Sequence, residues 1–173
     1  NLISSLTVGY QDDMSFTELP IPYFSVAADV VSCKAKNWGS GSVKSAIRST
    51  MSIPGLFDPV RTHGMVLVDG GTRNNFPTDI AESMGADVII GVELSEPGKT
   101  YSEINNLGNL LRPMIDMLGR ESFSKNVDKA DIFIKPNLAG FNMLSFDAAS
   151  IAEIRLIIFF FFSTSIPASI LHS

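Results

Sequence analysis

The chain has 173 residues, of which 45% are hydrophobic, and 13 Lys or Arg against 18 Asp or Glu give a formal net charge of -5. This length and composition suit one domain with a sizeable core, and the scattered basic residues argue against a nucleic-acid partner because they form no stripe that would displace counterions from phosphates. A single cysteine and two histidines exclude an internal disulfide framework and a histidine-rich metal cluster.

The first part of the chain predicts the end of a helix and then a strand. Apolar residues recur at helical spacing over residues 1–9, which indicates an amphipathic helix whose beginning the sequence does not include. Two prolines lead into the apolar run 23–28, a strand that we expect residues 30–31 to extend. Asp29 is expected to be a turn or cap residue rather than a catalyst. We expect Cys33 to be a small core residue.

The next segment predicts a turn, a helix and an apolar connection. Residues 37–41 are rich in turn formers, so we expect a loop there with Trp38 as an amphipathic lid. Ser42 is a good N-cap, and the apolar residues of 43–50 share one face, which predicts a short helix with a buried stripe. The connection 49–57 is unusually apolar, so we expect it to pack inward against the sheet.

A carboxylate followed by two glycines is the most informative stretch of the sequence. Residues 65–68 form an unbroken apolar run, typical of a strand covered on both faces in a parallel sheet. Asp69 therefore stands at the end of a strand, where ligands bind in open α/β sheets. Gly70 and Gly71 would let another group approach the carboxylate closely. The tripeptide alone is also typical of a tight turn whose aspartate bonds its own backbone.

Helix and strand patterns alternate through the rest of the chain. Residues 76–84 predict a helix that Pro opens and Gly caps, and 88–92 is the clearest buried strand. A capping box introduces a helix over residues 100–118, which Pro113 should kink, and 131–135 predicts another short strand. This alternation predicts an α/β fold with a mainly parallel sheet.

The end of the sequence is atypical. Residues 150–154 predict the start of a further helix, whereas the tail 155–173 contains the apolar run 156–162, far too short to cross a bilayer. A buried strand, an exposed aggregation-prone end and a sequence error are more ordinary explanations of this run.

No catalytic nucleophile is evident in the sequence. The serine elbow G-x-S-x-G is absent, because neither Ser40 nor Ser42 has glycine two positions before and two positions after it. His63 precedes Asp69 and would suggest a Ser-His-Asp triad, but an isolated histidine in a polar turn is usually solvated. No glycine-rich phosphate cradle, carboxylate pair or zinc spacing implies a cofactor or a metal.

An ordered set of blocks resembles the distal half of a patatin-like phospholipase domain, most of all that of bacterial members. The blocks are 46–60, the Asp-Gly-Gly stretch 67–71, the Asn-Asn-Phe-Pro at 74–77, and 84–92. The resemblance runs from about residue 2 to residue 154. We therefore divide the chain into the C-terminal part of a patatin-like domain, residues 1–154, and the atypical apolar tail, residues 155–173.

The resemblance implies a three-layer α/β/α sandwich with a mainly parallel sheet, incomplete in this chain. In that family a serine of G-x-S-x-G is paired with the aspartate of Asp-Gly-Gly, and an upstream glycine-rich loop forms the oxyanion hole. By this resemblance Asp69 matches the dyad aspartate, and Gly70 and Gly71 match its turn. Thr50 and Pro54 match the Ser-x-x-x-Pro block that lines the site, with threonine where serine is usual.

The resemblance and the missing elbow together predict a fragment of a serine acyl hydrolase that carries the base but not the nucleophile, and that is inactive alone. The expected partners are a lipid or other ester substrate, the missing N-terminal half of the domain and, peripherally, a membrane. A non-catalytic module that binds lipid or a partner is the alternative. A third interpretation is an unrelated α/β domain in which Asp-Gly-Gly is only a turn. Bacterial cell envelope and cytoplasm both stay open as locations.

Overall fold

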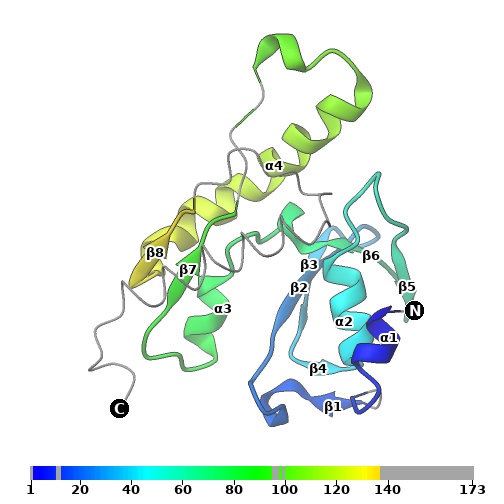
Figure 1. The fold of residues 1–173 in the computed structure, drawn as a ribbon, viewed down its shortest axis with the longest axis vertical. Helices are drawn as coiled ribbons and strands as arrows, with labels where there is room; N and C mark the ends of the chain where they lie inside the picture. Colours follow the sequence, from blue (N-terminus) through cyan, green and yellow to red (C-terminus); the bar gives the residue numbers. More distant parts are fainter. Residues whose placement is uncertain (1, 11–12, 95–97, 99, 137–173) are drawn as a thin grey trace.

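The computed structural model describes residues 2–10, 13–94, 98 and 100–136, which form a mixed α/β fold (Figure 1). The helix start expected at 150–154 and the tail 155–173 lie outside the described residues. The helices are α1 Leu2–Leu6, α2 Val43–Thr50, α3 Thr78–Ser83 and α4 Leu107–Asn126, with short 3-10 turns η1 Phe16–Glu18, η2 Gly70–Thr72, η3 Tyr101–Glu103 and η4 Val127–Lys129. The strands are β1 Met14–Ser15, β2 Ser25–Asp29, β3 Lys34–Trp38, β4 Ser40–Gly41, β5 Val60–Thr62, β6 Met65–Asp69, β7 Ile90–Val92 and β8 Ile132–Ile134.

The main sheet is antiparallel, with the strand order β3-β2-β6-β5. The connections explain the direction of the strands: β5 and β6 are joined by a two-residue turn, His63 and Gly64, both at positive φ of 46° and 77°. Such a turn suits a tight hairpin, whereas a parallel pair needs a crossover of about a dozen residues. The expectation of a mainly parallel sheet is therefore wrong for the described strands. Among them, only β7 and β8 pair in parallel.

The core lies where α2 packs on the β2–β6 face of the sheet (Figure 1). Its buried members come from five elements: Phe16, Ala27, Trp38, Val43, Ala46 and Leu67. The predicted N-cap is confirmed, since the Ser42 hydroxyl accepts a hydrogen bond from the Ser45 amide at 3.3 Å. One stripe of α2 is buried, as the spacing predicts.

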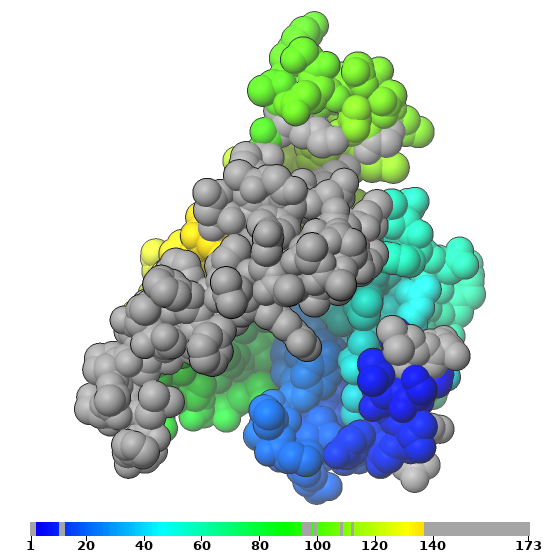
Figure 2. Space-filling model, in the orientation of Figure 1, coloured from blue at the N-terminus to red at the C-terminus, as the bar shows by residue number. Residues whose placement is uncertain are grey.

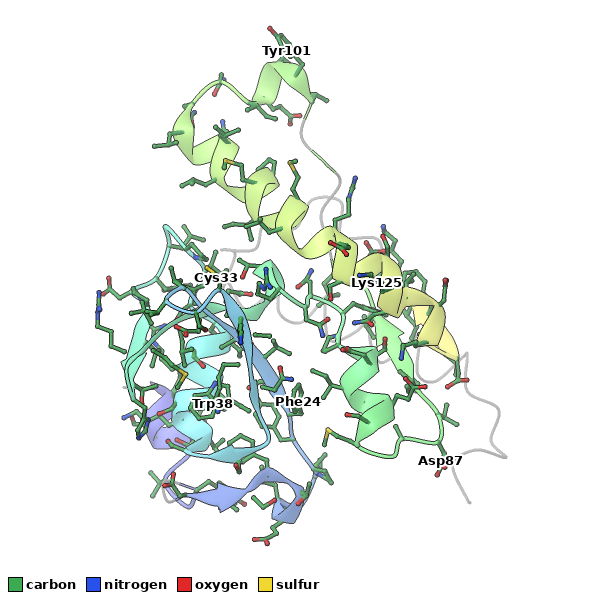
Figure 3. All side chains as sticks on the ribbon, turned by 180° about the vertical axis from the view of Figure 1, so that it is seen from behind. Phe24, Cys33, Trp38, Asp87, Tyr101 and Lys125 are labelled. Atoms are coloured by element: carbon green, nitrogen blue, oxygen red, sulfur yellow. The ribbon has the colours of Figure 1, made fainter. Side chains whose placement is uncertain are left out.

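Several expectations about residues 29–41 are wrong, and one is confirmed. Residues 37–41 belong largely to strands rather than to a loop. Trp38 is not a lid but a buried residue of the core that contains α2 (Figure 3). Cys33 is exposed, with a positive φ of 57°, in the turn between β2 and β3. Asp29 does act as a turn residue: it accepts from the amides of Val31 and Ser32 at 3.1 Å each. The strand ends there, so residues 30–31 do not extend it.

The remaining elements largely follow the pattern of the sequence. The α3 helix starts after Pro77, and Gly85 at a φ of 87° follows its C-cap. The capping box at Thr100 begins the separate turn η3 rather than the long helix. The α4 helix begins later, with its own N-cap at Asn106. The β7 strand is half-exposed rather than buried. Within the described ranges, no helix combines the length and apolar character that crossing a membrane requires.

The connection after α2 packs inward only in its first part. Ser52 is fully buried, whereas Leu56 and Phe57 are 49% and 43% exposed. The connection therefore divides into a part that supports the sheet and a part that contributes to the surface.

Candidate active site

Asp69 lies where strand β6, the connection after α2 and the turn η2 meet. It is the last residue of β6, where it faces Ala27 of β2 in the antiparallel register. Its amide donates to the Ser52 carbonyl at 2.9 Å, and its carboxylate Oδ1 accepts from the Gly71 amide at 2.7 Å. The predicted position at a strand end is therefore confirmed, and the backbone on both sides of the carboxylate is anchored.

The carboxylate of Asp69 is half-buried, with one oxygen engaged. Burial raises the pKa of this carboxyl above its ordinary range, and the hydrogen bond from the Gly71 amide opposes that rise. Among the described residues, no group donates a hydrogen bond to the second oxygen, Oδ2. The arrangement offers a proton acceptor that is more basic than a solvated aspartate and has one oxygen available.

Close contacts surround both glycines of the turn, with backbone at Gly70 and with the ends of side chains at Gly71. A Cβ at Gly70 would lie 2.2 Å from the Val26 carbonyl oxygen, and a Cβ at Gly71 would lie 2.8 Å from Oδ1 of Asn75. The group that approaches Gly70 is thus the protein's own backbone. The turn geometry is the expected one, since Oδ1 of Asp69 accepts from the amide two residues later, while Oδ2 has no donor among the residues that the structure describes.

Thr50 reaches the same region from α2. Its hydroxyl donates to the Val26 carbonyl at 2.6 Å, which is the carbonyl that lies against Gly70. Pro54 lies further along the connection and is half-buried. The structure therefore brings Thr50 to the back of the turn. The connection's direct contact with Asp69 is made by Ser52 instead.

Ser52 is a supporting residue that the sequence analysis missed. It is fully buried, its hydroxyl donates to the Arg48 carbonyl at 2.8 Å, and it accepts from the Arg48 guanidinium at 2.6 Å. These bonds hold Ser52 in place, and the backbone carbonyl of Ser52 accepts the hydrogen bond from the Asp69 amide. A serine between the apolar residues Met51 and Ile53 is the signal that identifies it, because a buried hydroxyl needs partners.

Helix α4 packs against the Asp69 turn, a contact that the sequence analysis did not predict. A Cβ at Gly119 would lie 2.2 Å from the Gly71 carbonyl oxygen, so the helix and the turn are in backbone contact. Further along α4, Asn126 is 5% exposed and donates to Oδ1 of Asn74 at 3.0 Å and to Oδ1 of Asp79 at 2.8 Å. Glycine inside a helix costs about 1 kcal/mol relative to alanine, so its presence is a signal of such close approach.

His63 does not contribute to this site. It lies in the turn before β6, at the opposite end of that strand from Asp69, and its Nδ1 bonds the Thr62 hydroxyl at 2.8 Å. A His-Asp pair is therefore excluded by the length of the strand, roughly 13 Å for five residues. Over the ranges that the structure covers, no group of three or more His, Cys, Asp or Glu could hold a metal ion.

Comparison with known proteins gives a consistent set of relatives. The patatin-like phospholipase family model matches residues 12–82, which include Thr50, Pro54 and the Asp69 turn. Over 101 residues the chain is 33% identical to patatin-like phospholipase domain-containing protein 7 of Mus musculus, which covers 57% of this chain and 7% of the mouse protein. An uncharacterized NTE family protein of Mycobacterium tuberculosis is 33% identical over 113 residues, 65% of this chain and 19% of that protein.

Patatin-like phospholipase domain-containing protein 6 of Homo sapiens is likewise 33% identical over 90 residues, 51% of this chain and 6% of the human protein. The chain therefore spans less than a fifth of the length of each of these relatives. The predicted resemblance to patatin-like phospholipases is confirmed, with bacterial proteins among the relatives.

Proposed function

From the match of residues 12–82 to the patatin-like phospholipase model, we propose that the chain is the part of a serine acyl hydrolase that supplies the catalytic base. The substrate is a lipid or another carboxylic ester. The nucleophilic serine, in a G-x-S-x-G elbow, comes from a longer protein, in which further strands complete a three-layer α/β/α sandwich.

Asp69 acts as the base of a Ser-Asp dyad in this proposal. Its Oδ2 accepts the proton of the serine hydroxyl while the serine oxygen attacks the ester carbonyl carbon. The proton passes to the leaving alkoxide as the ester C–O bond breaks, and an acyl-serine remains. A water molecule then gives a proton to Asp69 while its oxygen attacks the acyl-serine carbonyl carbon. As the bond between that carbon and the serine oxygen breaks, the proton passes from Asp69 to the serine oxygen, which releases the acid and restores the free serine and the ionised aspartate.

The observation that supports the role of Asp69 as the base is the asymmetric environment of its carboxylate. Oδ1 is held by the Gly71 amide, so the orientation of the group is set, and Oδ2 has no donor within the described part of the chain. Burial raises the pKa of this carboxyl, which makes it a better base for a hydroxyl than a solvated aspartate. Thr50 and Ser52 support the turn from the α2 side.

The first test compares two proteins, this 173-residue chain and the same chain extended upstream through one domain's length. We expect no hydrolysis of p-nitrophenyl butyrate by the chain alone. The extended protein, if it carries the serine elbow, should hydrolyse the ester, and Asp69→Asn should lower its kcat by about 10²- to 10⁴-fold.

Asp87→Asn, which changes an exposed carboxylate, is the matched control and should leave kcat within about twofold. Turnover by the chain alone that disappears in Asp69→Ala would refute the proposal. An upstream region without an elbow serine would replace it with a non-catalytic module that binds lipid or a partner.

A further inference from the structure

One face of α4 lies along the Asp69 turn. Gly119, Ser122 and Asn126 recur at helical spacing, and each contacts the turn or the residues directly after it. Gly119 meets the Gly71 carbonyl, while the Ser122 hydroxyl donates to Oδ1 of Asn74 at 3.0 Å. This face is therefore built to hold the turn rather than to pack in an apolar core.

The bonds of Asn126 converge on the segment that closes the turn. Its side-chain amide donates to Asn74 and to Asp79, and the Asn74 amide group itself donates to Asp79 at 3.0 Å. The backbone of Asn126 is engaged as well, because its carbonyl accepts from the Thr78 hydroxyl at 2.6 Å. A residue with this burial and these partners fixes the spacing between α3, α4 and the turn.

Asn74 connects this network to the backbone of the Asp-Gly-Gly stretch. Its own backbone amide donates to the Gly70 carbonyl at 2.8 Å, so a displacement of Asn74 is felt directly at the turn. The contacts therefore connect Asn126 to Asn74 and Asn74 to Gly70. Gly119 lies against the carbonyl of the next residue, Gly71.

We propose that Asn126 and Gly119 of α4 are positioning residues for Asp69, acting through Asn74 and the Gly71 peptide. The inference rests on the proposed function of Asp69 as a base, and it adds the element that holds the base in place. Loss of the Asn126 bonds, or a Cβ at position 119 that meets the Gly71 carbonyl oxygen, separates α4 from the turn, and the Gly71 amide loses its alignment with the carboxylate.

The test is an NMR titration of the full 173-residue chain. The Gly71 amide proton donates to Asp69, so its chemical shift should follow the protonation of that carboxylate as the pH is varied. In Asn126→Ala and Gly119→Ala we expect the amplitude of this titration to fall by at least about half. Ser122→Ala removes one bond onto Asn74 and should cause a smaller change in the same direction. This milder variant keeps the test decisive where a stronger one fails to fold.

Two controls separate positioning from general destabilisation. Lys125→Ala alters an exposed residue beside Asn126, and Phe16→Leu destabilises the core at a buried site away from α4; both should keep the full Gly71 titration. An unchanged titration in folded Asn126→Ala, Gly119→Ala and Ser122→Ala would overturn the proposal, as would an equal loss in Phe16→Leu. These outcomes do not depend on ester hydrolysis, so they are distinct from a failure of Asp69→Asn to lower kcat in the extended protein.

Discussion

The carboxyl group of Asp69 has a higher pKa in the folded chain than its ordinary value of 3.8, because burial penalises its charged form. A carboxyl of this kind stabilises the fold most when it is protonated. Its contribution is fully present below the ordinary value and is lost as the pH rises through the higher folded value. At neutral pH the ionised Asp69 therefore lowers the free energy of unfolding.

This sign leads to a prediction for Asp69→Asn. The amide keeps an oxygen that accepts from the Gly71 amide but carries no charge, so the variant should be more stable than the wild type at pH 7. The difference should shrink below pH 3.8, where the wild-type carboxyl is also neutral. Urea unfolding at pH 3 and pH 7 measures both values, with Asp87→Asn as an exposed control. A less stable variant at pH 7 would show that ionised Asp69 stabilises the fold.

Gly70 leads to a second prediction at the same scale. In Gly70→Ala the new Cβ would meet the Val26 carbonyl oxygen at 2.2 Å. The position of a Cβ is set by the backbone and the carbonyl is part of the backbone, so neither group can turn away. We expect a loss of at least about 2 kcal/mol in the free energy of unfolding. Gly39→Ala is the matched control, because no atom lies within 4 Å of its new Cβ, and its effect should stay within about 1 kcal/mol. Equal effects would contradict the close contact.

At the scale of the element, α4 divides into two parts with different surroundings. The later part contacts the Asp69 turn, while the earlier part projects from one end of the molecule together with η3 (Figure 2). The apolar side chains of residues 107–118 are at least partly exposed: Leu107, Leu110, Leu111, Met114, Met117 and Leu118. Their spacing gives a single apolar face, but that face is at least partly exposed.

The exposed face predicts a measurable surface property. Met117→Gln combined with Leu118→Gln replaces side chains that are 72% and 65% exposed, so the free energy of unfolding should change by less than about 0.5 kcal/mol. Binding of a hydrophobic dye such as ANS should fall by about half. Ile21→Gln, at a residue that is 82% exposed outside this face, should leave dye binding almost unchanged. A similar fall in both proteins would mean that the face is not the binding surface.

At the scale of the whole molecule, the sequence predicted local elements better than their arrangement. The Ser42 cap, α2, α3 and the strand before Asp69 follow from patterns within about ten residues. Strand direction does not, because an apolar run such as 65–68 is compatible with a parallel or an antiparallel sheet. For β5 and β6 the short His63-Gly64 turn is a local signal of a hairpin, but the antiparallel pairing of β2 with β6 joins strands that are far apart in the sequence and has no such signal.

The same distinction applies to the candidate site. Asp69 and its glycines form one continuous stretch, so a local pattern identifies them. Asn126 follows Asp69 by dozens of positions, and a helix of mixed polarity does not reveal which of its polar residues is buried. Their proximity is a property of tertiary packing, which sequence spacing within one element cannot express.

The exposed turn between β2 and β3 has a practical consequence. It holds Cys33, the only cysteine of the chain, so a maleimide fluorophore would attach at one defined position of the native sequence. The buried Trp38, the only tryptophan, lies at the far end of β3, the strand that follows this turn, and supplies a second reporter from within the core (Figure 3). Together they allow the surface and the interior of one hairpin to be followed separately in a single sample, without a substitution.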